Sequence, residues 1–308
     1  MLRKDLELYG PNAQPPRQVS PRKARRYCRR LAGRQYENFT VLSRFFPGRL
    51  RQHLCNVYAY CRWADDLADE TGDPRQSLAL LGWWERLLRE CYQGNTAHPV
   101  FVALAETIRK FEIPIDPFLD LLVAFRQDQR VVRYDTTDRL IEYCRYSANP
   151  VGRLVLYLGR CHTPGRAQLS DAICTGLQLA NFWQDVARDF DRGRVYLPQT
   201  DCRRYGYEPA HFIDRVCNEP FRLLLAAEVD WAEGWLSRGG ALVGLMPSEL
   251  RLPVAAFLHG GLAILEEIRR AEFDVWTARP VVGKIKKLRI LASLWWRLKR
   301  GTLGTDEE

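Results

Sequence analysis

The chain has 308 residues, of which 46% are hydrophobic and 27% charged, and its formal net charge is +9. This composition suits a globular protein with a large buried core and excludes a disordered chain. The longest apolar runs are much shorter than the roughly 20 residues of a spanning helix, and the N-terminus has no apolar signal core, so we expect a cytoplasmic protein.

Cysteine and histidine usage indicates no zinc site. The nine cysteines are scattered, and none forms a C-x-x-C pair, which is typical of reduced thiols rather than of disulfides or a zinc site. The five histidines also lack ligand spacing, so we assign no zinc and no histidine base. Since no G-x-G-x-x-G or Walker sequence is present, nothing supports a nucleotide cofactor.

Capping residues beside prolines mark the starts of several helices. A Ser or Asp can cap a helix, and a following proline suits its first turn. Such pairs occur at Ser20-Pro21, Asp73-Pro74 and Asp116-Pro117. Apolar residues follow each pair at i, i+3 and i+4, whereas strand signals are nearly absent, and Val131-Val132 is too short for a sheet. We therefore predict an all-α fold of about ten helices.

The sequence divides into three segments. Residues 1–20 are rich in proline and predict a flexible N-terminal arm. No repeat or shift in composition interrupts residues 21–283, so we expect a single domain there. Residues 284–308 combine a basic amphipathic helix with an acidic tail.

Two acidic stretches, CRWADDLADE (residues 61–70) and LQLANFWQDVARDFDRGRVYLP (residues 177–198), carry the main functional signal. Asp65 and Asp69 are four residues apart, so on a helix they share a face and repel each other. Asn181, Asp185 and Asp189 also step by four and form one stripe on a helix, which we expect to end near Gly193.

Two interpretations of these stretches are open. Each can be a solvated helix face with ordinary ion pairs, since Arg62 precedes Asp65 by three residues and Arg188 adjoins Asp189. Alternatively, two such helices facing across a cleft can hold Mg²⁺, which prefers oxygen ligands completed by phosphate. The repeated spacing among aromatic and aliphatic neighbours favours the second interpretation.

These two stretches closely resemble the aspartate-rich motifs of the squalene/phytoene synthase family, and the resemblance extends over about residues 35–275. Within it, QYENFTVLSRFFP, FRQDQRVVRYDTTDRLIEYCRYSANPVGRLVLYLG and NFWQDV are most similar to the bacterial hydroxysqualene synthase branch, the HpnC type of hopanoid biosynthesis. The resemblance implies a single-domain isoprenoid-synthase helical bundle around a deep apolar cavity.

Matching the motifs residue by residue gives the implied site. Metal ligands or diphosphate contacts would be Asp65, Asp69, Asn181, Asp185 and Asp189, and Asp66 is a weaker candidate. Catalytic tyrosines of the cavity or its flap would be Tyr58, Tyr143 and Tyr196, each of which could instead be a packed core residue. Substrate contacts would be Asn38, Arg62, Ser147, Asn149, Gln178 and Arg194.

Three positions depart from the family pattern. Gln184 stands where many relatives have Arg, which removes a fixed positive charge and weakens an interpretation with two bound diphosphates. Ser147 and Asn149 replace Val and Gly of a relatives' YVAG sequence, so they add polar groups to an apolar wall and could hold a water. Asn38 stands where relatives often have a Ser near the diphosphate.

The resemblance implies Mg²⁺-dependent ionisation of a prenyl diphosphate, with presqualene diphosphate and water giving hydroxysqualene as the leading reaction. The alternatives are head-to-head condensation of two farnesyl diphosphates to presqualene diphosphate and a non-catalytic assembly protein on the same fold. Other enzymes of squalene synthesis are candidate partners.

Two segments are rich in Lys and Arg, residues 22–34 and 284–300, and such segments can bind a negatively charged partner. Neither matches a nucleic-acid recognition fold, so we expect no nucleic acid. In the second segment, Leu288, Leu291, Trp295 and Leu298 recur at helical spacing beside lysines and arginines. This pattern is typical of a helix on an anionic membrane surface, here the inner face of the cell membrane, but also of a closing helix packed on the bundle.

Overall fold

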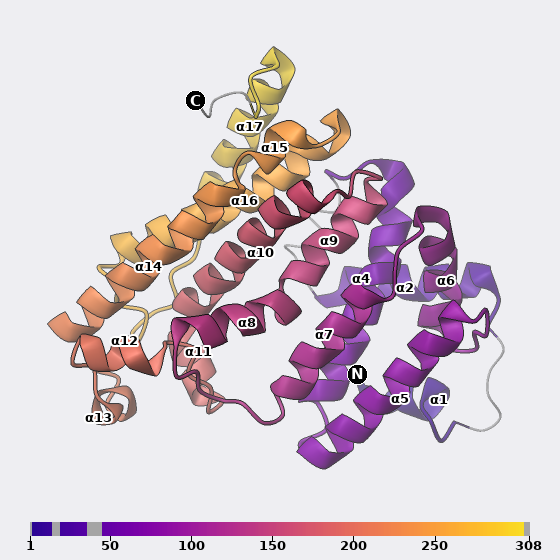
Figure 1. The fold of residues 1–308 in the computed structure, drawn as a ribbon, viewed down its shortest axis with the longest axis horizontal. Coiled ribbons are helices and arrows are strands. Elements are labelled where there is room, and N and C mark those ends of the chain that lie inside the picture. Colours follow the sequence, from indigo (N-terminus) through magenta and orange to yellow (C-terminus); the bar gives the residue numbers. More distant parts are fainter. Residues whose placement is uncertain (1, 14–18, 36–44, 305–308) are drawn as a thin grey trace. The chain divides into compact units, whose positions relative to one another are not determined.

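The protein is described from a computed structural model over residues 2–13, 19–35 and 45–304 (Figure 1). Helices form nearly all the regular structure of these residues, and their one β interaction is an isolated bridge between Arg133 and Val195. The predicted all-α class is thus confirmed. This part of the chain holds 16 helices rather than about ten, because five of them have eight residues or fewer and are too short to show an amphipathic pattern. Within the same residues, none of the helices has the length and apolarity needed to cross a bilayer.

The chain forms two compact units, the first of which contains residues 1–130 and 153–162. Its helices are α1 (Leu2–Tyr9), α2 (Pro21–Gln35), α4 (Gly48–Asp69), α5 (Pro74–Tyr92), α6 (Pro99–Phe111), α7 (Asp116–Gln127) and the second part of α9 (Asn149–Leu158). Helix α4 is central, because it contacts α2, α5, α6 and α7. The Trp63 ring of α4 belongs to a buried aromatic cluster. It stacks on Trp84 of α5 with ring centres 5.2 Å apart, and the Trp84 ring centre lies 4.5 Å from that of Phe101 on α6. This packing fixes the helix that carries the first acidic stretch.

The second unit contains residues 131–152 and 163–308. Its helices are α8 (Thr137–Ser147), the start of α9, α10 (Pro164–Gln184), α11 (Val186–Asp191), α12 (Gln199–Arg204), α13 (Pro209–Ile213), α14 (Glu219–Gly239), α15 (Leu242–Leu245), α16 (Ser248–Arg270) and α17 (Lys284–Arg300). Helix α10 packs beside α14, α16 and α8 (Figure 1). The approach to α14 is close, because a Cβ on Gly176 would lie 2.9 Å from the backbone nitrogen of Leu236. These contacts hold the helix whose end carries the second acidic stretch.

The helix starts predicted from capping pairs are confirmed. Helix α2 begins at Pro21 and α5 at Pro74, where the Asp73 side chain accepts a hydrogen bond of 2.9 Å from the Arg75 backbone N–H. At α7, Asp116 is the first helical residue rather than the cap, a position where its charge complements the helix dipole.

The N-terminal segment contains a helix that the expected flexible arm did not include. Residues Leu2–Tyr9 form α1, and the Tyr9 ring lies 5.6 Å from that of Tyr27 on α2. The predicted boundaries at residues 20 and 283 stay predictions.

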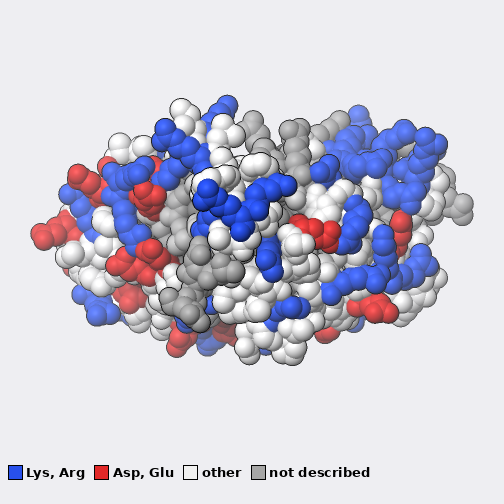
Figure 2. Space-filling model, turned by 90° about the horizontal axis from the view of Figure 1, so that it is seen from above, with Lys and Arg blue, Asp and Glu red and all other residues white. Residues whose placement is uncertain are grey.

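The surface reflects the basic composition. On the face shown in Figure 2, Lys and Arg side chains cover more area than Asp and Glu.

Candidate active site

The first acidic stretch occupies the last turns of α4, as predicted. Arg62 lies among its carboxylates: Nη1 is 2.8 Å from Asp65 Oδ2, Nη2 contacts Asp66 Oδ1, and Glu70 Oε1 lies 3.7 Å away. Burial raises the pKa of Asp66 to about 7 against the opposing effect of Arg62. Arg62 therefore offsets the repulsion within this stretch, while Asp69, the last residue of α4, is exposed.

The second acidic stretch spans the end of α10 and the short α11, rather than one helix that ends near Gly193. The break falls at Asp185, whose φ is −106° and ψ is 15°. Aspartate is a weak helix former, and this side chain bonds outside its own helix. The backbone ladder nevertheless continues, because Asp185 N–H donates to Asn181 O and Asp189 N–H to Asp185 O, both at 2.9 Å. The predicted i, i+4 register of the three residues is kept, and Gly193, with φ of 76°, follows α11.

Two carboxylates and several arginines crowd this second stretch. Burial raises the pKa of Asp189 to about 7, and the Asp185 charge adds to this effect. Arg192 and Arg194 oppose it, and the Arg194 backbone N–H donates to Asp189 O at 2.8 Å. The predicted substrate contact Arg194 thus lies beside a predicted metal ligand.

Arg279 is the main site residue that the sequence did not reveal. Its Nε donates to Asp185 Oδ1 at 2.6 Å and its Nη2 to Asp185 Oδ2 at 2.7 Å, a two-pronged ion pair in which both side chains are less than one-third exposed. The same Nη2 donates to Gln184 Oε1 at 2.7 Å, and Gln184 Nε2 donates to the carbonyl of Pro280. Gln184 lacks the positive charge that many relatives have at this position, and Arg279 supplies one from 95 residues further along the chain, in a segment without a recognisable pattern.

The structure brings two of the predicted tyrosines together. The Tyr196 ring stacks on that of Phe182 on α10, with ring centres 3.8 Å apart. The ring centre of Tyr143 on α8 lies 6.0 Å from that of Tyr196. Tyr134 joins them, with its ring 5.7 Å from Tyr196 and 5.4 Å from Tyr143. All four rings are less than 10% exposed. Aromatic faces attract cations, so this cluster can stabilise positive charge that develops on a bound hydrocarbon.

The Ser147 hydroxyl at the end of α8 and the Asn149 side chain at the start of α9 are also buried. Asn149 is 7% exposed, and its Oδ1 accepts a hydrogen bond of 3.0 Å from Thr175 Oγ1 on α10. The Ser147 Oγ is buried and has no hydrogen-bond partner within the described part of the chain. A buried hydroxyl without a protein partner is a place where a water can bind.

The remaining predicted residues have different positions. Tyr58 is half-buried on α4, and Gln178 is half-buried on α10, one turn before the exposed Asn181. Asn38 lies outside the described residues.

The side chains present fit Mg²⁺ as a partner of a diphosphate. Among the described residues no three His, Cys, Asp or Glu side chains converge on a common point. Mg²⁺ needs no such cage, because it usually binds one or two carboxylates together with waters and substrate phosphates. Each acidic stretch supplies such carboxylates, and each holds a residue whose pKa is raised to about 7 chiefly by burial, so a divalent cation would stabilise the charged form of both.

Comparison with known proteins identifies the family. The family model of squalene/phytoene synthase matches residues 24–286. A phytoene synthase from Arthrospira platensis is 30% identical over an alignment of 277 positions, which covers 86% of this chain and 90% of the relative. The solved structure of squalene synthase HpnC from Alicyclobacillus acidocaldarius is 43% identical, covers 85% of this chain and 99% of its own, and has a TM-score of 0.79. A dehydrosqualene synthase solved with a ligand is 25% identical, with a TM-score of 0.82 and coverage of 91% and 98%.

The chain therefore belongs to the squalene/phytoene synthase family, an enzyme family of isoprenoid biosynthesis. The resemblance expected from the two acidic stretches is confirmed, and so is the similarity to HpnC.

Proposed function

We propose that this protein converts presqualene diphosphate and water into hydroxysqualene and diphosphate, in an Mg²⁺-dependent reaction of squalene and hopanoid biosynthesis. The observation that carries the proposal is the buried Ser147 hydroxyl, which has no hydrogen-bond partner among the described residues, beside the buried Asn149, where relatives have apolar residues. The 43% identity to the HpnC structure, against 30% to the phytoene synthase, supports the same branch.

The reaction begins with cleavage of the bond between carbon and the diphosphate oxygen, and the bonding electrons leave with the diphosphate. Bound Mg²⁺ would neutralise charge on the departing diphosphate. The residues we propose to bind Mg²⁺ are Asp65 and Asp69 in the first unit and Asn181, Asp185 and Asp189 in the second. Arg194 and Arg279 of the second unit are cations suited to diphosphate oxygens. The side chains of Tyr143 and Tyr196 would face the carbocation that remains.

Capture of the carbocation by water completes the proposed reaction. Ser147 would fix the water by a hydrogen bond of about 1 kcal/mol net, and Asn149, oriented by Thr175, would supply a second. The water oxygen bonds to the carbon, and its proton leaves with the released diphosphate. The product is an alcohol because oxygen, rather than hydride, reaches the cation.

Condensation of two farnesyl diphosphates to presqualene diphosphate is the second candidate. Arg279 favours it, because its guanidinium beside Gln184 retains a positive charge that two diphosphates would need. Incubating the purified protein with Mg²⁺ and each diphosphate, followed by mass spectrometry of the lipids, distinguishes the two reactions. Absence of diphosphate release from both substrates would instead favour the assembly protein.

Ser147→Ala tests the role of the hydroxyl. We expect diphosphate release from presqualene diphosphate to persist while product shifts from hydroxysqualene to eliminated or rearranged hydrocarbons. The matched control is Ser170→Ala, which removes another buried hydroxyl in the same unit. An unchanged product ratio in Ser147→Ala would show that bulk water captures the cation.

A further inference from the structure

Helix α17 carries an unusual concentration of positive charge. It contains seven Lys or Arg residues in 17 and no acidic residue. The family model matches as far as residue 286, within the first turn of this helix. Its composition needs an explanation apart from the reaction.

One face of α17 is fixed to the second unit. The Lys286 ammonium lies 2.6 Å from a carboxylate oxygen of both Glu266 and Glu267 on α16. Leu294 is 2% exposed, and after the helix the chain returns to bury Leu303 to the same extent. The helix is thus held at its start, its middle and beyond its end, and its outer face has a defined orientation.

The opposite face is apolar and exposed. Ile285 and Leu288 are 69% and 67% exposed, and Trp295 and Trp296 are 51% and 52% exposed. The spacing of these residues places them, with Ala292, on one side of the helix, which we call the outward stripe. The sequence predicted a stripe with Leu291 and Leu298, but the structure turns these two toward the unit, where they are half-buried.

Two cations lie beside the tryptophans of the outward stripe. The Arg300 guanidinium lies 3.2 Å from the centre of the Trp296 ring, and the Lys299 ammonium lies 5.6 Å from that of Trp295. Indole rings with a charged group beside them suit the boundary between lipid headgroups and acyl chains.

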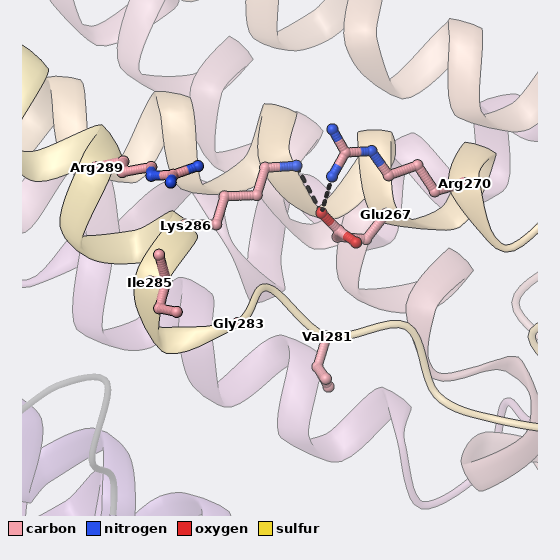
Figure 3. A pocket seen from close by; sticks show the side chains of 7 residues that line it. All are labelled: Glu267, Arg270, Val281, Gly283, Ile285, Lys286 and Arg289. Carbon is pink, nitrogen blue, oxygen red and sulfur yellow. Dashed lines mark hydrogen bonds and ion pairs between the residues drawn. The ribbon is translucent and has the colours of Figure 1, made fainter.

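A surface pocket of about 600 Å³ lies at the start of α17, and both charged and apolar side chains line it (Figure 3). Lys286 and Arg270 both reach Glu267, so their charges are largely compensated. Arg289 is exposed and makes no ion pair with any of the described residues, while Val281 is 58% exposed at the pocket edge. Free cationic and apolar groups thus meet at the same surface.

We propose that the outward stripe docks this protein on an anionic membrane surface. Apolar side chains would enter the interface, and the flanking cations would contact acidic headgroups, since both terms contribute to binding of amphipathic helices. Nucleic acid would attract the cations but would leave the outward stripe in water. The charge complementarity, the absence of acidic residues in α17 and the paired tryptophans favour lipid over a protein partner. This inference does not depend on which reaction the protein catalyses.

Co-sedimentation of the full chain with phosphatidylcholine vesicles, with and without phosphatidylglycerol, tests the proposal. We expect binding only with the anionic lipid and a loss of binding at high salt. Leu288→Ser combined with Trp295→Ser should weaken binding on the order of tenfold. Lys284→Gln combined with Arg289→Gln should weaken it about 25-fold, or about fivefold for each cation.

The matched control places the same type of change elsewhere on the second unit. Ile213 and Leu223 are 73% and 53% exposed and lie on α13 and α14, so replacing both by Ser should leave vesicle binding unchanged. Equal loss in this control, or wild-type binding by both α17 variants, would overturn the proposal. So would a wild-type dimer in size-exclusion chromatography that the α17 variants abolish without any vesicle binding, because that result assigns the outward stripe to a second copy of the chain.

Discussion

Arg279→Gln should weaken the interaction with a prenyl diphosphate and at the same time ease binding of Mg²⁺. The side chain makes two hydrogen bonds to Asp185, at 2.6 and 2.7 Å, and both residues are only partly exposed. A hydrogen bond to a charged group contributes about 1.5 to 3 kcal/mol, and partial exposure favours the lower part of this range. Loss of one such contact to diphosphate should raise the KM about 10- to 30-fold.

The same substitution should strengthen Mg²⁺ binding, whereas it weakens binding of the diphosphate. In the metal-free protein Arg279 occupies both oxygens of Asp185, so it competes with a cation for this carboxylate. Its removal should lower the Mg²⁺ concentration needed for half-maximal diphosphate release. Opposed shifts in the two quantities cannot come from partial unfolding, which would reduce both affinities.

Arg188→Gln is the matched control for this substitution. Arg188 also faces Asp185, but at 3.5 Å and with a side chain 64% exposed, so solvent screens its charge. We expect less than about a twofold effect on either quantity. Adding Gln184→Arg to the Arg279→Gln variant should restore part of the diphosphate affinity, because it places a guanidinium where many relatives have one. Unchanged KM and Mg²⁺ dependence in Arg279→Gln would refute the role of this residue in the site.

Three further predictions concern metal binding, pH and packing. Asp65→Ala and Asp185→Ala should each abolish Mg²⁺-dependent diphosphate release. The free energy of unfolding should change by less than about 1 kcal/mol in Asp65→Ala, whose side chain is 41% exposed, and should fall by about 1 to 3 kcal/mol in Asp185→Ala, which also loses the ion pair with Arg279. Turnover in both variants would contradict the assignment. Burial, together with the Asp201 carboxylate, raises the pKa of Glu228 from 4.5 to about 8, so the folded state keeps a proton that the unfolded state loses and stability should fall as pH rises through this interval. Glu228→Gln should flatten that fall and raise the free energy of unfolding at pH 8 by roughly 2 to 4 kcal/mol, as measured by urea denaturation, whereas the exposed Glu90→Gln should not. Gly176→Ala should destabilise the protein by about 1 to 3 kcal/mol, because its Cβ would meet the Leu236 backbone, while Gly165→Ala on the same helix meets no atom within 4 Å and should be neutral or stabilising in thermal denaturation.

The sequence by itself determined the features that depend on local chemistry. Helix starts at Pro21 and Pro74 were predictable because a cap and a proline act within one turn. The i, i+4 spacing of Asp65 with Asp69 and of Asn181 with Asp185 likewise places side chains on a helix face without any distant contact. These local patterns sufficed to predict the fold class and the family, although the break at Asp185 needed the structure.

Only the tertiary structure decided which distant residues complete the site. Arg279 reaches Asp185 across 94 residues, and Thr175 of α10 orients Asn149, which begins α9, across 26. Nothing in the sequence next to either pair marks its partner, because such contacts follow from how helices pack rather than from local preference. The same holds for α17, whose amphipathic pattern is compatible with two orientations. Burial of Leu294 against the unit selected one of them and left the outward stripe in solvent.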